Sequence, residues 1–420
     1  MSRVIIAGAG LAGLACAVRL AKAGVNVSLV EAAPQAGGRC RSFHEKSLDT
    51  TIDNGNHLLL SGNTAALGFL KEVGAEDRLI GPPGAAFPFA DLASGERWTV
   101  MPNRGYLPWW ILHPGRRVAG TTPMDYLSVA RMLKSRHGAL FTDIVQPRGT
   151  LYERFWDPFI VAVLNVLPGE AAAELITPVL WQTFGRGAAA CRPLVARLGL
   201  SDTFVEPALT YLKEHGGTVA FGCRAADVTF DHGCVSSLRC GTDKVDLGPD
   251  DQLVLAVPAP VAQDMVPGLE APTAYSSIVN LHFKVPAGPR LDSPFIGLVN
   301  GLAQWLFVRD GIASVTISAA GDVADRPGDE IALQVWREIA PIMDLPLDPL
   351  PLNRVIKERR ATFRQSPDQV ARRPGTRTGF ANLFLAGDWT DTGIPATIEG
   401  AIRSGNTAAD AVLSALEPGR

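Results

Sequence analysis

The sequence predicts an α/β fold built on a Rossmann-type domain whose parts lie far apart in the chain. One part is the apolar run Val4–Ala7, which is followed by glycines at positions 8, 10 and 13. Another is the apolar run 383–386, which ends at Gly387 and Asp388 and precedes a helical pattern. A dinucleotide-binding domain that begins near the N-terminus and is completed near the C-terminus is discontinuous in sequence. We therefore expect a mixed α+β domain with a helical lobe to be inserted within it.

Length and composition limit the class of protein. The chain has 420 residues, of which 47% are hydrophobic, and a formal net charge of −3. That length allows two or three domains and a large core, and the near-neutral charge gives no reason to expect nucleic acid as a partner. A strand pattern begins at Arg3 without the basic and apolar regions of a signal peptide. The longest apolar stretch, residues 155–167, is too short and too interrupted to span a bilayer.

The cysteines indicate a reducing compartment. None of the 6 cysteines forms a C-x-x-C pair, and metal-ligand spacing is absent. We therefore expect a reduced, cytoplasmic protein without a metal site.

The N-terminal glycines match the spacing of a dinucleotide-binding turn. Gly8 permits the tight turn, Gly10 lets a pyrophosphate approach the backbone, and Gly13 lets the helix pack closely on the strand. The helix begins near Leu11 and Ala12, so its N-terminus faces the phosphates.

Glu31 strengthens this interpretation. A second strand pattern, residues 27–30, ends at Glu31, eighteen residues after Gly13. A carboxylate at this place accepts hydrogen bonds from ribose hydroxyls. Glycine spacing alone is weak evidence, but the strand, helix and acid together make an ordinary glycine-rich turn a poor alternative.

The segment after Glu31 separates FAD from NAD. Gly37-Gly38-Arg39 resembles the G-G-R signature of the FAD-dependent amine oxidase and phytoene desaturase superfamily. The resemblance implies the GR2-like flavoprotein fold and non-covalent FAD. It also implies that the glycines let a loop cross close to the cofactor while Arg39 neutralises pyrophosphate charge.

The C-terminal segment completes the predicted flavin site. In this superfamily Gly387 and Asp388 lie at the ribityl or phosphate region of the flavin. The next helix has an N-terminus near Thr397, Ile398 and Ala401, which we expect beside the pyrimidine end of the flavin, where a helix dipole favours negative charge. Glu399 is expected to complement the helix dipole rather than to act in catalysis. No cysteine follows Cys240, which excludes cysteinyl attachment of flavin in this segment.

Further strand patterns lie at residues 217–221, 225–228, 233–247 and 252–257. The superfamily resemblance implies that Val228 contacts the adenine. No second G-x-G-x-x-G occurs, so we expect no NADPH domain and an external reductant, drawing on NADPH. The predicted FAD-binding domain comprises residues 1–75, 216–268 and 352–420. The substrate-binding domain comprises 76–215 and 269–351, with a helical lobe around 104–200.

The helical lobe mixes aromatic and basic residues. The run 106–112 contains Trp109 and Trp110 and is followed by Arg116 and Arg117. Such a patch suits insertion into an anionic leaflet; the alternative is a core-lining segment beside a solvated basic face. The wider basic cluster comprises Arg104, Arg116, Arg117, Arg131, Lys134, Arg136 and His137.

Several motifs together resemble the bacterial squalene-associated FAD-dependent desaturase family. They are Asp53-Asn54-Gly55-Asn56-His57, Ala361-Thr362-Phe363, Pro367, Arg373-Pro374, residues 385–390 and residues 392–401. The resemblance implies reductive removal of the hydroxyl of hydroxysqualene, a long apolar isoprenoid, and a peripheral position at the inner face of the cytoplasmic membrane.

The same resemblance places Asn54 and Gly55 near the flavin. His57 is then a candidate general acid, with a turn-holding histidine as the alternative. Asp53 is expected to cap the backbone rather than to act as an acid. Three other functions share this fold: a carotenoid-type desaturase, an amine oxidase, and a lipid escort that needs no reducible flavin.

Overall fold

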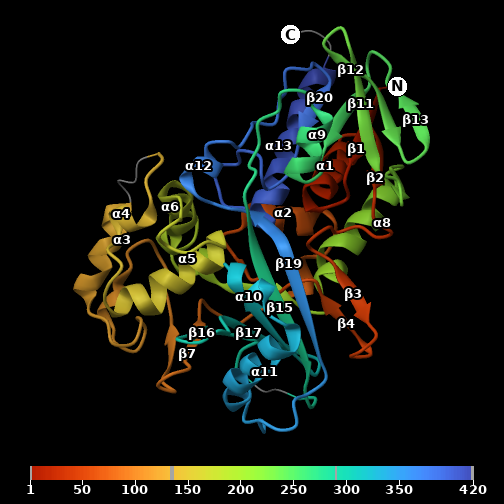
Figure 1. The fold of residues 1–420 in the computed structure, drawn as a ribbon. Helices are drawn as coiled ribbons and strands as arrows, with labels where there is room; N and C mark the ends of the chain where they lie inside the picture. The colour runs from red at the N-terminus through yellow and green to blue at the C-terminus, as the bar shows by residue number, and fades with distance from the viewer. Residues whose placement is uncertain (1, 133–136, 289–290, 418–420) are drawn as a thin grey trace.

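The computed structural model describes residues 2–132, 137–288 and 291–417. Figure 1 shows the two chain ends close together on a parallel-sheet domain, from which the long strands β15 (Tyr275–Lys284) and β19 (Asn353–Phe363) run into a second domain. A lobe of short helices lies to one side. The predicted α/β fold with inserted elements is confirmed.

The first domain contains a parallel sheet of five strands. Their order is β10-β2-β1-β14-β20, so chain segments distant in sequence pair side by side. Alternate residues of the central strand face opposite layers: Ile6 packs against the helices, and Ile5 packs on the other side. The strands are β1 (Arg3–Ala7), β2 (Asn26–Glu31), β10 (Thr218–Phe221), β14 (Gln252–Leu255) and β20 (Leu383–Leu385).

Helices on one face bring the two ends of the chain together. Small residues let α1 and α13 approach closely, because a Cβ on Gly405 would lie 2.1 Å from the carbonyl oxygen of Ala12. Only glycine fits this crossing. The helices that share this core are α1 (Leu11–Lys22), α2 (Thr64–Glu72), α8 (Glu206–Glu214) and α13 (Ile398–Leu416).

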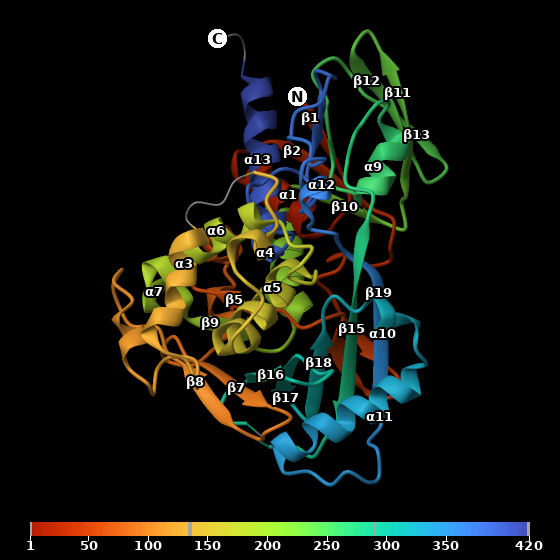
Figure 2. The ribbon, with the colours of Figure 1, turned by 60° about the vertical axis from the view of Figure 1, so that its left-hand side comes forward.

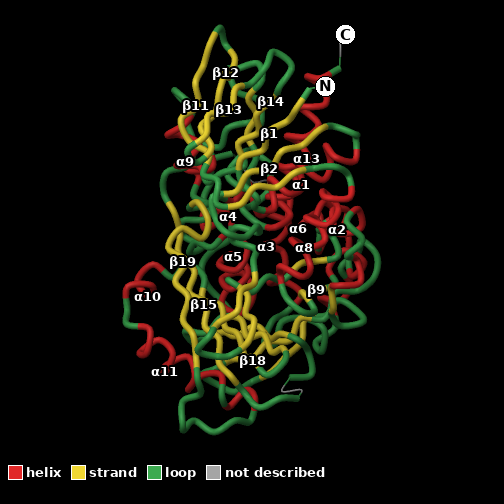
Figure 3. Tube along the Cα trace, turned by 90° about the vertical axis from the view of Figure 1, so that its right-hand side faces the viewer, coloured by secondary structure: helices red, strands yellow, loops and turns green. Residues whose placement is uncertain are grey.

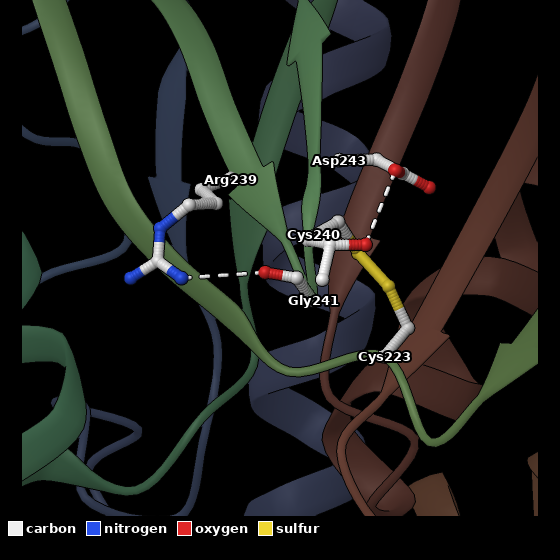
Figure 4. Close-up of a disulfide and its surroundings, with 6 residues drawn as sticks. Cys223, Arg239, Cys240, Gly241 and Asp243 are labelled. Carbon is white, nitrogen blue, oxygen red and sulfur yellow. Dashed lines mark hydrogen bonds between the residues drawn. A yellow bond between two sulfur atoms is a disulfide. The ribbon is translucent and has the colours of Figure 1, made fainter.

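The other face carries α9 (Ala259–Met265) and a small antiparallel sheet of β11 (Ala225–Asp231), β12 (Cys234–Cys240) and β13 (Asp243–Asp246). A disulfide joins Cys223 to Cys240 at the end of β12 (Figure 4). The expectation that all cysteines are reduced is therefore wrong for this pair. The two Cα atoms lie 5.4 Å apart, within the range a disulfide requires, and the paired strands bring together residues 17 positions apart in sequence. The other four cysteines are free.

A mixed seven-stranded sheet forms the second domain, in the order β19-β15-β18-β17-β16-β7-β8. Figure 2 shows α11 (Gly328–Ile339) lying along one side of this sheet, where Ile331, Val335 and Trp336 pack against it. The remaining strands are β7 (Phe87–Asp91), β8 (Arg97–Val100), β16 (Phe295–Val299), β17 (Trp305–Arg309) and β18 (Ile312–Ile317), and α10 (Gly321–Asp325) packs nearby.

The helical lobe packs around Phe141, Trp156 and Ile160, in an apolar core that it shares with β7, β8 and β16. Its helices are α3 (Leu127–Met132), α4 (Phe141–Ile144), α5 (Asp157–Leu164), α6 (Ala173–Gln182) and α7 (Ala188–Cys191). Among the described residues, no helix is long and apolar enough to cross a membrane.

Short elements connect the domains. They are the hairpin β3 (Ser42–Glu45) and β4 (Thr50–Asp53), the small strands β5 (Leu59–Leu60), β6 (Leu79–Ile80) and β9 (Pro193–Ala196), and α12 (Pro367–Val370). Figure 3 shows the strands β15 and β19 continuing from one domain into the other.

Two predicted domain boundaries need correction. The strand β19 belongs to the seven-stranded sheet, whereas the sequence pattern places residues from 352 onward in the FAD-binding domain. The helix α8 packs in the core beside α1, although residues up to 215 were assigned to the substrate-binding domain. In both cases tertiary pairing, which the local pattern does not encode, decides the domain.

Candidate active site

The glycine turn between β1 and α1 has the geometry of a phosphate-binding loop. Gly8 has a φ of +106°, and a Cβ there would lie 2.4 Å from the carbonyl oxygen of Ala256. A Cβ on Gly13 would lie 1.9 Å from the carbonyl oxygen of Gly8, so helix and strand touch at that point. At Gly10, by contrast, no described atom lies within 4 Å of the added Cβ. The loop is thus closed on one side and open on the side where a pyrophosphate would approach.

Glu31 organises this loop. Its carboxylate accepts hydrogen bonds from the backbone amides of Ala9, at 2.7 Å, and Ala33, at 2.8 Å. Two carboxylate oxygens can accept about four hydrogen bonds in total, so capacity remains for ribose hydroxyls. The carbonyl oxygen of Glu31 also accepts from the amide of Cys223, at 2.9 Å. The disulfide segment is thereby attached to the predicted ribose site.

The G-G-R segment crosses directly over the glycine turn. The amide of Gly37 donates to the carbonyl oxygen of Ala9 at 2.8 Å. Gly37 and Gly38 have φ values of +105° and +56°, which favour glycine. A Cβ on Gly38 would lie 3.4 Å from the Cα of Gly10. Glycines at these positions let the two loops meet.

Arg39 joins the two predicted half-sites. Its guanidinium donates to the carboxylate of Asp388 at 2.7 Å and also to the carbonyl oxygen of Ala361. The carboxylate raises the pKa of Arg39 further above its ordinary value. Residues 349 positions apart in sequence therefore meet in a charged pair, half exposed on the arginine side.

The turn after β20 is held by an arginine that sequence reasoning did not assign to the site. Arg373 is 7% exposed and donates to the carbonyl oxygens of Asp388, Thr390 and Ile394. The hydroxyl of Thr392 accepts a further bond at 2.9 Å. Burial lowers the pKa of Arg373. The only sequence signal was the Arg373-Pro374 pair in the family motif.

Thr397, which the sequence places near the N-terminus of α13, caps this helix. The Thr397 hydroxyl accepts from the amide of Gly400 at 3.1 Å. Ile398 is 8% exposed and Ala401 is partly buried. The amide of Gly387 donates to the hydroxyl of Ser404 on the same helix, at 2.8 Å. The Gly387–Asp388 turn is therefore attached directly to this helix.

Glu399 has a structural partner that the sequence did not indicate. Its carboxylate is 4% exposed and accepts from the amides of Ala65, at 3.0 Å, and Ala66, at 2.8 Å. These are the first amides of α2. Glu399 complements a helix dipole, as expected, but mainly that of a neighbouring helix rather than its own.

Asp53 is fully engaged with protein groups. One carboxylate oxygen accepts from the Ser42 hydroxyl at 2.6 Å and from the Leu200 amide at 2.9 Å. The other lies 3.0 Å from the guanidinium of Arg309. This geometry favours the capping role over proton donation.

His57 lies at the end of the same turn and is partly exposed. Among the described residues, no partner hydrogen-bonds to its ring. Burial lowers its pKa from 6.5 to about 4; the nearby carboxylate of Asp53 opposes this, and Arg39 reinforces it. The imidazole is therefore neutral at neutral pH.

Three further predicted cofactor contacts lie on this turn and on β11. The side-chain amide of Asn54 donates weakly to the carbonyl oxygen of Arg39, at 3.4 Å, and Gly55 packs against Asn280. Val228 is partly buried and packs against the same core cluster as Val30, at the end of β2.

These residues fit FAD. One connected surface supplies groups for the phosphates, the ribose and the flavin. These groups are the open side of Gly10, the carboxylate of Glu31, the cation of Arg39 and the capped N-terminus of α13. Among the described residues, no cluster of metal-ligating side chains occurs.

The chain matches the family model described as flavin containing amine oxidoreductase over residues 11–413. A hydroxysqualene dehydroxylase from Sinorhizobium fredii is 44% identical to it over 98% of both chains. Relatives of the same name from Rhodopseudomonas palustris and Zymomonas mobilis are 45% and 43% identical, over 99% of this chain and 99% and 100% of theirs. A probable zeta-carotene desaturase from Synechococcus elongatus is 23% identical over 98% of this chain and 99% of its own.

Solved structures share the fold. An oxidoreductase from Methanosarcina mazei superposes with a TM-score of 0.73 at 15% identity, covering 97% of this chain and 100% of its own. Cyclohexylamine oxidase from Brevibacterium oxydans superposes with a TM-score of 0.69 at 16% identity, covering 99% of both chains.

Proposed function

The chain belongs to the flavin-containing amine oxidoreductase family, and we propose that within this family it acts as a hydroxysqualene dehydroxylase. The observation that carries this proposal is identity of 43–45% to three relatives of that name over nearly the whole of each chain. Carotenoid desaturases match at only 21–23%. The cradle residues supply the cofactor site that such an enzyme requires.

The proposed reaction replaces a hydroxyl group by hydrogen. Hydroxysqualene loses its hydroxyl as water and gains a hydride at the same carbon, giving squalene. The hydroxyl is allylic, so the developing carbon charge is delocalised. Reduced flavin, when bound, supplies the hydride. The leaving hydroxyl needs a proton, because hydroxide is a poor leaving group.

The chain's own residues bind and orient the cofactor. The amides at the start of α1 and the Arg39 guanidinium would hold the pyrophosphate, and Glu31 would accept from the ribose. The N-terminus of α13, fixed by the Thr397 cap, favours negative charge at the pyrimidine end of the flavin. Arg373 holds the turn between β20 and α13.

His57 is our candidate for delivering the proton. Its imidazole is neutral in the cofactor-free protein, so a role as acid requires that it gain a proton when negative charge arrives beside it. An electron-rich reduced flavin is such a charge. A water molecule held in the pocket is the alternative donor.

The electrons come from outside the chain in this proposal. The sequence contains one G-x-G-x-x-G turn only, and that turn is committed to FAD. We propose an external carrier that draws on NADPH.

We also propose that the helical lobe docks on an anionic membrane surface, which would place the protein at the inner face of the cytoplasmic membrane. Tyr106 and Leu107 are 78% and 79% exposed, and Trp109 is 50% exposed. Further exposed apolar side chains of the lobe, which together we call the lobe patch, are Leu112, Met124, Leu127 and Trp181.

Contacts between segments connect the loops that carry the lobe patch. A Cβ on Gly187 would lie 2.2 Å from the carbonyl oxygen of Gly105, so the segment after Trp181 touches the loop that carries Tyr106 and Leu107. Arg117 donates to the carbonyl oxygens of Leu112 and Thr121, which joins that loop to the segment of Met124. Exposed apolar side chains on neighbouring loops suit a partner that is itself apolar.

Two details of the predicted patch change. Trp110 is 6% exposed and packs edge-on against Tyr126, so it belongs to the core. Arg116 lies over the Trp109 ring at 5.0 Å and donates to the carbonyl oxygen of Met101, so its charge is partly engaged. Arg104, Arg131 and His137 are exposed, whereas Lys134 and Arg136 lie outside the described residues.

Anaerobic incubation tests the proposed reaction. Protein reduced with dithionite is mixed with hydroxysqualene, and extracts are analysed for squalene. We expect squalene to form while the flavin reoxidises. Conversion of phytoene by the oxidised protein, without squalene formation, would favour a carotenoid desaturase instead.

The same assay distinguishes the roles of His57. If His57 donates the proton, His57→Gln should slow squalene formation by about 10²–10⁴-fold, because an amide cannot protonate the leaving group. If His57 only holds the turn, His57→Gln should stay active while His57→Ala loses flavin.

A further inference from the structure

A chain of hydrogen bonds lies behind the turn that carries His57. The side-chain amide of Asn280 donates to the carbonyl oxygen of Asn54 at 3.2 Å. The hydroxyl of Thr316 donates to the Asn280 side-chain oxygen at 2.9 Å. The Asn56 amide nitrogen donates to the Thr316 hydroxyl at 3.1 Å. Asn280, on β15, is 3% exposed, and Thr316, on β18, is 8% exposed.

The carbonyl oxygen of Asn54 fixes the donor and acceptor of every hydrogen bond in this series. A backbone carbonyl can only accept, so the Asn280 nitrogen must face Asn54 and its oxygen must face Thr316. The single Thr316 hydrogen then goes to Asn280, which leaves the hydroxyl oxygen to accept from Asn56. The Asn56 nitrogen therefore points inward, and its oxygen, Oδ1, points away from the chain.

Asn56 Oδ1 has no donor among the described residues, and the side chain of Asn56 is only partly buried. The turn that carries it is held tightly: a Cβ on Gly55 would lie 3.0 Å from the Asn280 nitrogen. The amide of Asn54 also donates to the carbonyl oxygen of Arg41 at 2.9 Å. The free acceptor thus belongs to the residue before His57, on a turn that Asn54 joins to the carbonyl oxygen of Arg39 in the G-G-R segment.

We propose that Asn56 Oδ1 accepts the hydroxyl hydrogen of the substrate, and that Thr316 and Asn280 are positioning residues that hold Asn56 in this orientation. The inference rests on the proposed function. Hydroxysqualene is a hydrocarbon with one polar group, so a preorganised acceptor is needed only where the hydroxyl lies. The buried members of this hydrogen-bond series, Asn280 and Thr316, are satisfied, whereas the partly buried Asn56 keeps a free acceptor oxygen.

The proposed contact suits the chemistry. When the substrate O–H donates to Asn56, both lone pairs of the substrate oxygen stay free to take up the proton that converts the hydroxyl into water. The carbon–oxygen bond then breaks with its electron pair on oxygen, and the hydride arrives at carbon. Asn56 itself neither gains nor loses a proton.

Ligand affinity measures this contact without turnover. The oxidised holoenzyme is titrated with hydroxysqualene and with squalene, which lacks the hydroxyl, and the flavin absorbance change reports binding. Asn56→Ala should weaken hydroxysqualene binding about tenfold, the worth of one hydrogen bond of about 1.4 kcal/mol, and leave squalene binding within twofold. Thr316→Val should weaken hydroxysqualene binding by a smaller factor, because the Asn56 amide is then free to turn.

Ser314→Ala is the matched control, because Ser314 lies on the same strand as Thr316 but hydrogen-bonds to His282, which is not part of this hydrogen-bond series. In this variant the ratio of the affinities for hydroxysqualene and squalene should equal that of the wild type. An unchanged ratio in both Asn56→Ala and Thr316→Val, or equal weakening of both ligands, would overturn the inference. If Asn56→Ala loses its flavin, the ratio in Thr316→Val decides. Failure of the wild type to make squalene from hydroxysqualene would instead contradict the proposed function itself.

Discussion

At the scale of single residues, Glu31 both shapes the glycine turn and leaves acceptor capacity for ribose. Its carboxylate holds the amides of Ala9 and Ala33. Glu31→Arg replaces this acceptor by a cation, so we expect the purified protein to contain almost no FAD. Glu31→Gln, which keeps one acceptor oxygen, should retain part of the FAD. The ratio of flavin to protein absorbance is the measurement, and a stoichiometric ratio in Glu31→Arg would contradict the assignment.

Two histidines with lowered pKa values make the fold sensitive to acid. Burial lowers the pKa values of His57 and His282 from 6.5 to about 4, and His282 is 1% exposed. Between pH 6.5 and 4 the unfolded chain binds a proton that the folded chain does not. The stability is therefore complete above pH 6.5 and falls as pH drops through this window, by about 1.4 kcal/mol per pH unit for each residue.

His282→Gln removes one of these titrations. In flavin-free protein, the urea midpoint should fall less between pH 7 and pH 5 in this variant than in the wild type. Parallel losses in the two proteins would show that His282 does not titrate in this window.

At the scale of elements, Glu399 couples α13 to α2. Glu399→Leu leaves the amides of Ala65 and Ala66 without their acceptor, which should lower the free energy of unfolding by about 1–3 kcal/mol. Glu399→Gln should cost less. Urea titration measures the loss. A catalytic role predicts another pattern, namely normal stability and slow squalene formation in Glu399→Gln.

The elements that sequence could predict are those with a local signal. The glycine spacing, the strand before it and the helix after it lie within thirty residues, and the structure places them as expected. Asn280 and Thr316 carry no such signal, and Arg373 is marked only by the Arg373-Pro374 pair, because their roles depend on partners from other elements. The Cys223–Cys240 pair was missed for the same reason: the pairing of β11 with β12 brings the cysteines together.

At the scale of the whole molecule, the lobe patch predicts binding to anionic membranes. Leu107→Ser combined with Trp109→Ser removes two exposed apolar side chains, each worth about 1.5–3 kcal/mol when buried. Flotation with anionic liposomes should show at least tenfold weaker binding than the wild type. Leu352→Ser is the control, because Leu352 is 62% exposed but lies outside the lobe.

The basic residues of the lobe add an electrostatic contribution of about 1 kcal/mol each near such a surface. Wild-type binding should therefore decrease as salt increases. A wild-type protein that does not float with liposomes at low salt would contradict the membrane proposal.

The central claim is that this flavin site delivers hydride to the carbon that bore the hydroxyl. A single turnover in D₂O tests it most directly, because the transferable hydrogen of reduced flavin exchanges with solvent. The dithionite-reduced protein is mixed anaerobically with one equivalent of hydroxysqualene, and the product is analysed by mass spectrometry. We expect one squalene per flavin reoxidised, each carrying one deuterium. Squalene without deuterium, or flavin that stays reduced while hydroxysqualene persists, would contradict the claim.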